Sequence, residues 1–378
     1  MRILLPISAA LLLSAAPGQA QDMSGAKSFC SDVPAYALSS DEFPFIERSG
    51  DNPSISQSFA ASQCIEQIIM PESSGPSGPS TLQAMSDAPL SLQQTGLNTV
   101  NLFSSDQPVS NLTQRFSGTQ TIHNSIVAGA LGALTTISQS GVNTANTIEG
   151  TTIELAVQVM ETGALQAVDN SLQIGGSIAS ISQAGDNIAN IARAEYAIGV
   201  GVQEIGSESA QIVTNRLDLA AGSNIADHIH QSGTNVGNML IADTVDSVIR
   251  RFDGTQVVDN TVILNDGHRP HITQSGNNIA NFILAQSVGT ISQISTGTQR
   301  VYNSVRGPDG REIRHANFEQ SQSNYMGASN VVNLMIVGSR NAGQDNDEME
   351  ISQQAEFSQT ANGTGGQSQS GNVLVINR

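Results

Sequence analysis

Residues 137–146 read Ile137-Ser138-Gln139-Ser140-Gly141-Val142-Asn143-Thr144-Ala145-Asn146, and close variants of this stretch recur along the chain. The glutamine at its third place returns every 43 to 48 residues. Self-similarity at a fixed spacing is the signature of a repeat architecture, in which each unit buries its inward face against its neighbours. The stretch therefore predicts stacked, equivalent units. The five copies begin at Leu92, Ile137, Ile181, Ile229 and Ile272.

A second pattern lies between these copies and reads Gln120-Thr121-Ile122-His123-Asn124-Ser125-Ile126. It recurs every 43 to 46 residues, in strict alternation with the first pattern. An earlier copy at Gln63 opens the array, and worn copies near residues 351–359 and 369–375 close it. Counting both kinds gives about fourteen units of about 22 residues each.

The spacing inside each pattern indicates β-strands. Glutamine, aliphatic residue, asparagine and aliphatic residue fall two positions apart, so they share one face of a strand. The same alternation places Asn187, Ala189 and Ile191 on one face, as it does Asn278, Ala280 and Phe282 in a later copy. Glycines such as Gly141 are permissive residues typical of tight turns. The sequence thus predicts an all-β solenoid of strand-turn-strand units.

Inward amides need partners, because an unpaired buried amide costs about 1–3 kcal/mol. Identical residues stacked one turn apart can bond to each other along the axis, as in cross-β structures. We therefore predict internal ladders, while the sequence leaves open whether one turn holds 22 or 45 residues, and its handedness. The predicted ladder residues are Gln94, Gln139, Gln183, Gln231 and Gln274; Asn98, Asn143, Asn187, Asn235 and Asn278; Gln120, Gln166, Gln211, Gln256 and Gln299; and Asn124, Asn170, Asn215, Asn260 and Asn303.

The amino-terminal region predicts export. Residues 1–20 combine one charge, Arg2, with an apolar run and small residues before residue 21, as in a signal peptide. We expect a leader or cap over 21–53 and the repeat domain over 54–378, with insertions near 71–89, 306–314 and 338–349. Cys30 and Cys64 are the only cysteines. In an exported protein they predict one possible disulfide.

The charge of the chain argues against nucleic acid as a partner. Without Arg2, 14 basic residues face 33 acidic ones, which gives 14 − 33 = −19. A polyphosphate would be repelled by such a surface. No later stretch approaches the 18 uninterrupted apolar residues of a membrane-spanning helix.

The combination Gln139-x-Gly141 followed by Asn143-x-Ala145 resembles the curlin repeat, across roughly residues 54–378. The distance from Gln139 to Asn143 is one residue shorter than in that family, and this chain carries more units. The resemblance implies a secreted β-solenoid with Gln/Asn ladders, found in cell-surface amyloid fibres for adhesion and biofilm. A long chain of this kind is also similar to surface proteins that anchor a polysaccharide holdfast.

The sequence carries no nucleophile, nucleotide-binding or zinc-protease signature, so we expect no enzyme activity, no catalytic residue and no cofactor. His228 and His271 precede inward isoleucines and should face outward. The acidic run Asp345–Glu350 lacks the full spacing of a calcium loop, so we predict no metal site, although calcium binding there stays open.

These observations favour an exported structural protein at the cell surface, acting in adhesion, biofilm or holdfast anchoring. Its expected partners are other surface or matrix components, with polysaccharide and further copies of itself as candidates. A β-helix enzyme acting on polysaccharide and an outer-membrane β-barrel are the alternatives. Scattered acidic residues argue against the first, and 4% aromatic residues with no Trp argue against the second.

Overall fold

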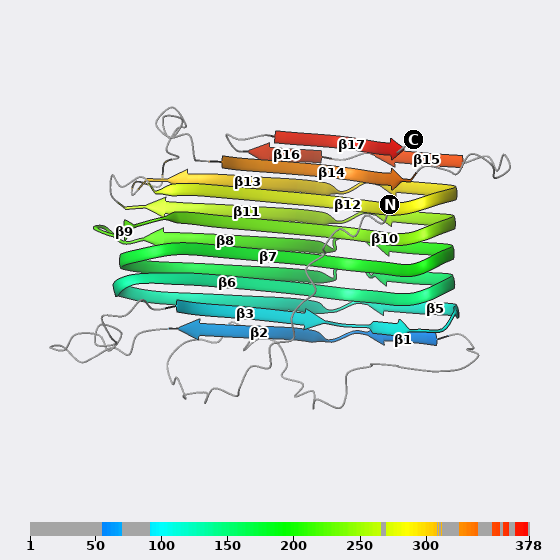
Figure 1. The fold of residues 1–378 in the computed structure, drawn as a ribbon, viewed down its shortest axis with the longest axis horizontal. Helices are drawn as coiled ribbons and strands as arrows, with labels where there is room; N and C mark the ends of the chain where they lie inside the picture. Colours follow the sequence, from blue (N-terminus) through cyan, green and yellow to red (C-terminus); the bar gives the residue numbers. More distant parts are fainter. Residues whose placement is uncertain are drawn as a thin grey trace.

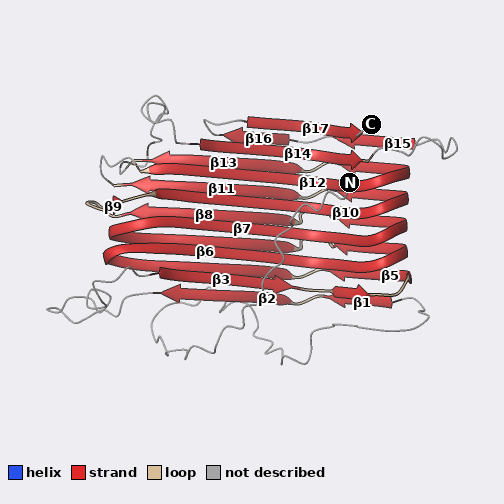
Figure 2. Cartoon of the chain, viewed as in Figure 1, coloured by secondary structure: helices blue, strands red, loops and turns tan. Residues whose placement is uncertain are grey.

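The computed structural model describes residues 55–69, 91–265, 270–307, 309, 311, 325–338, 350–355, 358–362 and 367–376. Every regular element in these ranges is a β-strand, and the strands form one hydrogen-bonded system of parallel pairs. Figure 1 shows the chain wound into a flat stack, from β1 and β2 at one end to β15–β17 at the other. Figure 2 shows the same stack as strand almost throughout. The predicted β-solenoid is confirmed.

The chain stays extended around many of its bends, so several strands cover more than one straight segment. The strands are β1 (Ile55–Phe59), β2 (Ser62–Ile69), β3 (Ser91–Thr99), β4 (Leu102–Ser105), β5 (Val109–Phe116), β6 (Thr119–Met160), β7 (Leu165–Ile205), β8 (Ala210–Leu219), β9 (Asn224–Ile225), β10 (His228–Phe252), β11 (Thr255–Leu264), β12 (His271–Ser295), β13 (Thr298–Arg306), β14 (Tyr325–Val337), β15 (Glu350–Ala355), β16 (Ser358–Asn362) and β17 (Gln367–Ile376).

One turn of the solenoid holds about 45 residues, which answers the question that the sequence leaves open. Gln120 on β6 pairs in register with Gln166 on β7, and Gln139 pairs with Gln183. Units of the same kind therefore stack directly on each other. The two alternating patterns occupy the same turn, and seven turns make up the described stack.

Each turn consists of two facing layers. The second pattern lies in one layer and the first pattern in the other, with the chain reversing at both narrow edges. In the third turn, for example, the strand segment from Leu165 faces the segment from Ile181, and the two are joined by hydrogen bonds across the interior. The interior between the two layers is therefore narrow, and the inward side chains of the facing strands fill it.

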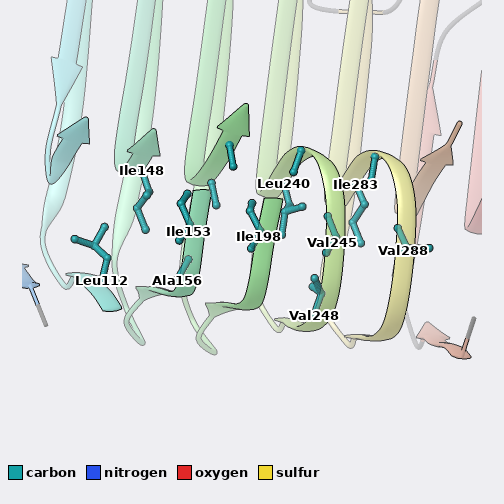
Figure 3. Packing of buried hydrophobic residues seen from close by; sticks show 14 of the residues in the cluster. Leu112, Ile148, Ile153, Ala156, Ile198, Leu240, Val245, Val248, Ile283 and Val288 are labelled. Carbon is teal, nitrogen blue, oxygen red and sulfur yellow. The ribbon is translucent and has the colours of Figure 1, made fainter. Parts of the chain in front are cut away.

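Both narrow edges are closed by columns of aliphatic residues. At one edge, Leu112, Ile148 and Ile153 stack with Ile198, Leu240 and later equivalents, as Figure 3 shows. At the other edge, isoleucine and leucine side chains from β6, β7, β8, β10, β11 and β12 form a second column. Fully burying such a side chain contributes about 1.5–3 kcal/mol, so each turn of the chain is fixed at its two bends.

The repeated glycines do not form the predicted tight turns. Gly141 and Gly185 lie inside continuous strands, β6 and β7, and pair in register with each other. A Cβ atom at Gly185 would lie 2.5 Å from a methyl group of Val213 in the facing layer. The glycine is therefore needed for space rather than for backbone freedom, because a valine from the opposite layer occupies the place of its side chain.

The sequence also predicted that Asn187, Ala189 and Ile191 share the inward face, and this prediction is wrong for Ile191. Asn187 and Ala189 point inward as expected, but Asn190 is buried as well, while Ile191 is only partly buried. Ala189 and Gly237 are both left out of the pairing while the register continues unchanged on either side, so two successive side chains, Ala189 and Asn190, turn inward there. In the later copy, Phe282 is shifted outward in the same way.

Several predictions fall outside the described residues. These are the signal peptide 1–20, the leader 21–53, the segment 71–89, Cys30, and Asp345–Glu348. Cys64 lies on β2, and the described part of the chain holds no free thiol. The Cys30–Cys64 bridge stays a prediction.

Candidate functional site: the internal amide ladders

The first predicted ladder runs through the layer that carries the first pattern. The Nε2 of Gln139 donates to Oε1 of Gln94 at 2.7 Å, and Gln183 donates to Gln139 at 3.0 Å. Gln231 and Gln274 continue the column at 2.7 Å each. All four donors are fully buried, so the column pairs polar groups that would otherwise destabilise the interior.

The other three predicted ladders are equally regular. The Asn98 column links its five members and extends to Asn330, with Nδ2–Oδ1 distances of 2.8–2.9 Å. The Gln120 column continues to Gln299 at 2.8–2.9 Å. The Asn124 column continues to Asn303 at 2.8 Å. Every predicted ladder residue therefore lies in a column of its own kind.

Two further ladders are present that the sequence analysis missed. One is an asparagine column that starts at Asn101, with Nδ2–Oδ1 distances of 2.6–2.8 Å. The other is a glutamine column that contains Gln57, Gln114, Gln158 and Gln203. The signal was present, because from Asn101 to Asn281 and from Gln114 to Gln203 the members are 43 to 48 residues apart. The asparagine column escaped notice because its members lie three residues after those of the Asn98 column, which breaks the period of two.

Each amide also bonds across the interior, which explains why the two layers stay together. An amide offers two N–H donors and one carbonyl acceptor. The second hydrogen of Gln166 reaches the backbone oxygen of Ile188 at 3.0 Å, and that of Asn170 reaches Ala184 at 2.8 Å. The columns thus tie successive turns together and also tie one layer to the other.

Glutamine columns face asparagine columns, and the two kinds run in opposite directions. Gln183 contacts the backbone of Asn170 directly across the interior. Glutamine donates to the preceding turn, as from Gln183 to Gln139, whereas asparagine donates to the following turn, as from Asn170 to Asn215. Hydrogen-bonded chains polarise their members, so facing columns present antiparallel dipoles, an electrostatically favourable arrangement.

The buried polar atoms without a partner lie mostly where a column begins or breaks. Asn101 is the first asparagine of its column, and its Oδ1 has no donor. Gln274 has an unpartnered Oε1 because Met326, which carries no amide, takes the next place in the register. Asn124 follows Gln67 in the register, and its Oδ1 is unpartnered because the longer side chain of Gln67 donates to the backbone oxygen of Thr95 instead. The ladders therefore satisfy themselves except where the sequence interrupts them.

Arg250 interrupts a ladder in mid-stack. It takes the place between Gln203 and Gln293 in the register and is completely buried. Its Nη1 donates to the backbone oxygen of Phe282 at 2.7 Å, but Nε and Nη2 have no partner. Burial lowers the pKa of Arg250 to about 9. A guanidinium offers no acceptor, so Nε2 of Gln293 is left unpartnered. The Oε1 of Gln203 receives no hydrogen bond from Arg250 and is unpartnered as well.

The remaining titratable candidates do not gather into a site. His228 and His271 are exposed neighbours in the register, as predicted, and His228 contacts Asp227 at 2.8 Å. Burial, and then the charge of His228, lower the pKa of His230. Burial raises the pKa of Asp186 and a hydrogen bond from Thr234 partly offsets this. Within the described ranges, no three His, Cys, Asp or Glu side chains are grouped to hold a metal ion.

Comparison with known proteins gives no match to a family model, a curated protein or a solved structure. No helix in the described part of the chain is long and apolar enough to cross a membrane.

Proposed function

We propose that this chain is an exported structural protein of the cell surface that acts in adhesion, biofilm or holdfast anchoring. The observation that carries the proposal is the set of amide ladders, which join successive turns through most of the stack. In the described turns, such an interior is filled by bonded side chains and gives a stiff body with two broad outer faces. A load-bearing or surface-presenting role uses both properties. The resemblance of the repeat to curlin sequences agrees with it.

Within this proposal, we favour a discrete body over a subunit that polymerises end to end. The Gln94 column stops at Gln274, two turns before the end of the stack, because Met326 follows it. A column that ends inside the molecule cannot continue into a second copy. The Asn101 column does reach the last turn at Asn372. End-to-end polymerisation could therefore still use this one ladder.

Deletion of the gene in the source cell tests the role in adhesion. We expect the deleted strain to lose attachment to a solid surface or to its matrix, and the reintroduced gene to restore it. Labelling of intact cells with an antibody should detect the chain outside the cell. Unchanged attachment of the deleted strain would contradict the proposal.

Negative-stain microscopy of residues 21–378 separates the two variants. Seven turns at the strand spacing of about 4.8 Å give a stack about 30–35 Å long. We expect particles of this size that stay separate after incubation. Long unbranched fibres would show that the chain polymerises.

A further inference from the structure

A pocket of about 200 Å³ opens on the outer face of β8, β11 and β13. These strands belong to three successive turns and pair in register. Because neighbouring strands lie about 4.8 Å apart, side chains from all three can reach one small ligand. The lining residues are Thr214, Arg216, Asp259, Thr261, Ile263 and Arg306.

Two arginines at this pocket have no acidic partner among the described residues. Arg216 and Arg306 are both exposed. Among the residues that the structure describes, arginine ion pairs form only at Arg115, Arg251 and Arg311. Arg216 and Arg306 are therefore free to bind an anionic group, and the planar fork of arginine suits a carboxylate.

The local charge is opposite to that of the whole chain. The charged residues on β8, β11 and β13 are Arg216, Asp218, Asp259, Arg300 and Arg306, which gives 3 − 2 = +1. The full chain has a net charge of −18. Asp169 on β7 is the register partner of Thr214 and adds a negative charge beside the pocket. The attraction for an anion therefore comes from direct contact with Arg216 and Arg306 rather than from the net charge of the face.

The rest of the pocket is suited to hydroxyl groups. Thr261 donates its hydroxyl hydrogen to Oδ1 of Asp259 at 2.8 Å. The hydroxyl of Ser304 lies 3.0 Å from that of Thr261, so Ser304 is the donor in this pair. This chain of hydroxyls leaves the second oxygen of Asp259 able to accept from a ligand, beside the apolar side chain of Ile263.

We propose that this pocket binds a single hexuronate residue of an acidic polysaccharide. Arg216 and Arg306 would hold the sugar carboxylate, Asp259 would accept from a ring hydroxyl, and Ile263 would contact an apolar face of the ring. Pockets for drug-sized ligands have volumes of about 300–1,000 Å³. The volume of this pocket is smaller, and this smaller size fits a single sugar ring. The inference rests on the proposed function, because it names the class of glycan to which the surface would attach.

Isothermal titration of the purified chain, residues 21–378, with a galacturonate trimer tests the proposal. We expect saturable binding that weakens as salt is raised from 50 to 500 mM (about a tenfold range), because the contacts are ionic. Arg216→Gln and Arg306→Gln should each weaken binding about tenfold, since each removes a charge-assisted pair. Arg300→Gln is the matched control, because it removes the same charge from the same face but does not line the pocket, and it should keep at least half of the affinity.

Three results would overturn the inference. The first is that a neutral galactose trimer binds as tightly as the galacturonate trimer. The second is that sulfate displaces the bound trimer as well as galacturonate does at the same concentration. The third is that Arg216→Gln and Arg306→Gln both keep the parent affinity while their circular dichroism spectra are native. Each uses purified protein, so each is separable from the adhesion test in cells. A chain that fails here while its deletion still abolishes attachment would attach through another surface.

Discussion

At the scale of single residues, the interior shows how costly it is to change one member of a ladder. Gln183 donates to Gln139 and accepts from Gln231, so it completes two contacts at once. Arg250 is an interruption that the chain already contains, with two of its own atoms and two glutamine atoms left unpartnered. These two positions give opposite predictions.

Replacement of Gln183 by leucine should destabilise the protein by about 2–4 kcal/mol. The change keeps the approximate volume but leaves the buried Oε1 of Gln139 without a donor and removes the acceptor of Gln231, and an unsatisfied buried group costs about 1–3 kcal/mol. Urea unfolding followed by circular dichroism measures the change. Ser182→Ala, on the outer face of the same strand, should stay within about 0.5 kcal/mol. Equal stability of Gln183→Leu and the parent would show that the ladder does not stabilise the fold.

Arg250→Gln should raise the free energy of unfolding, by about 1–4 kcal/mol. It would restore a donor to Gln203 and an acceptor to Gln293, and replacement of buried ionic groups by groups that suit the site often stabilises by this amount. Arg251→Gln is the matched control, since its side chain is 58% exposed, and a change of about 0.5 kcal/mol or less is expected there. Loss of stability in Arg250→Gln would mean that the guanidinium has a structural role that glutamine cannot fill.

The advantage of Arg250→Gln should shrink at alkaline pH. Burial lowers the pKa of Arg250 to about 9 in the folded chain, well below its ordinary value. The unfolded chain thus binds more protons above pH 9, and stability rises with pH wherever that holds. The cost of the buried charge is complete below about pH 9 and is relieved above it. Denaturant unfolding of both proteins between pH 7 and 10.5 (a range of about four units around that pKa) should show the two curves approaching each other. Parallel curves would contradict the shifted pKa.

At the scale of the strand, glycine and valine are matched across the interior. Gly185 receives a methyl group of Val213, and Gly233 receives one of Val258. In the sixth turn, alanine replaces glycine at residue 328, and in the following turn Ala361 takes the register place after Val301. The sequence therefore departs from both glycine and valine near the end of the stack, and we expect the sizes of the two side chains to be coupled.

A double-mutant cycle at Gly185 and Val213 tests this coupling. Gly185→Ala alone should destabilise by about 1–3 kcal/mol, because overpacking of a close-packed interior has that cost. Val213→Ala alone should also destabilise, through the lost methyl groups. The double variant should be more stable than the sum of the two single changes predicts, by at least about 0.5 kcal/mol. Simple additivity would show that the two side chains do not compete for space.

The sequence predicted the strands and four of the six ladders because both follow from a period of two and a spacing of about 45. It failed where a local feature breaks that period. Two successive inward side chains, such as Ala189 and Asn190, hid the Asn101 column. Gly185 was interpreted as a turn because a single strand cannot show which residue faces it across the interior. The arginine pocket was also missed, since Arg216 and Arg306 are 90 residues apart and only the stacking of turns brings them together.

At the scale of the whole molecule, the number of residues in a turn determines which residues stack on each other and how many turns the stack contains. Turns of about 45 residues pair each pattern with itself, so that ladders contain one kind of residue and both layers close over a shared interior. Turns of 22 residues would stack the two patterns on each other, with Gln139 beside Gln166. The first arrangement gives seven turns and the second gives fourteen.

Cysteine cross-linking on the outer face distinguishes the two arrangements directly. Ser140 and Ala184 are register partners, 44 residues apart, and neighbouring strands bring Cα atoms close enough for a disulfide. Ser140→Cys with Ala184→Cys should form a disulfide under mild oxidation, identified by peptide mass spectrometry. Ser140→Cys with Ala167→Cys should not, because Ala167 lies in the facing layer. A disulfide in the second pair and none in the first would contradict the seven-turn solenoid.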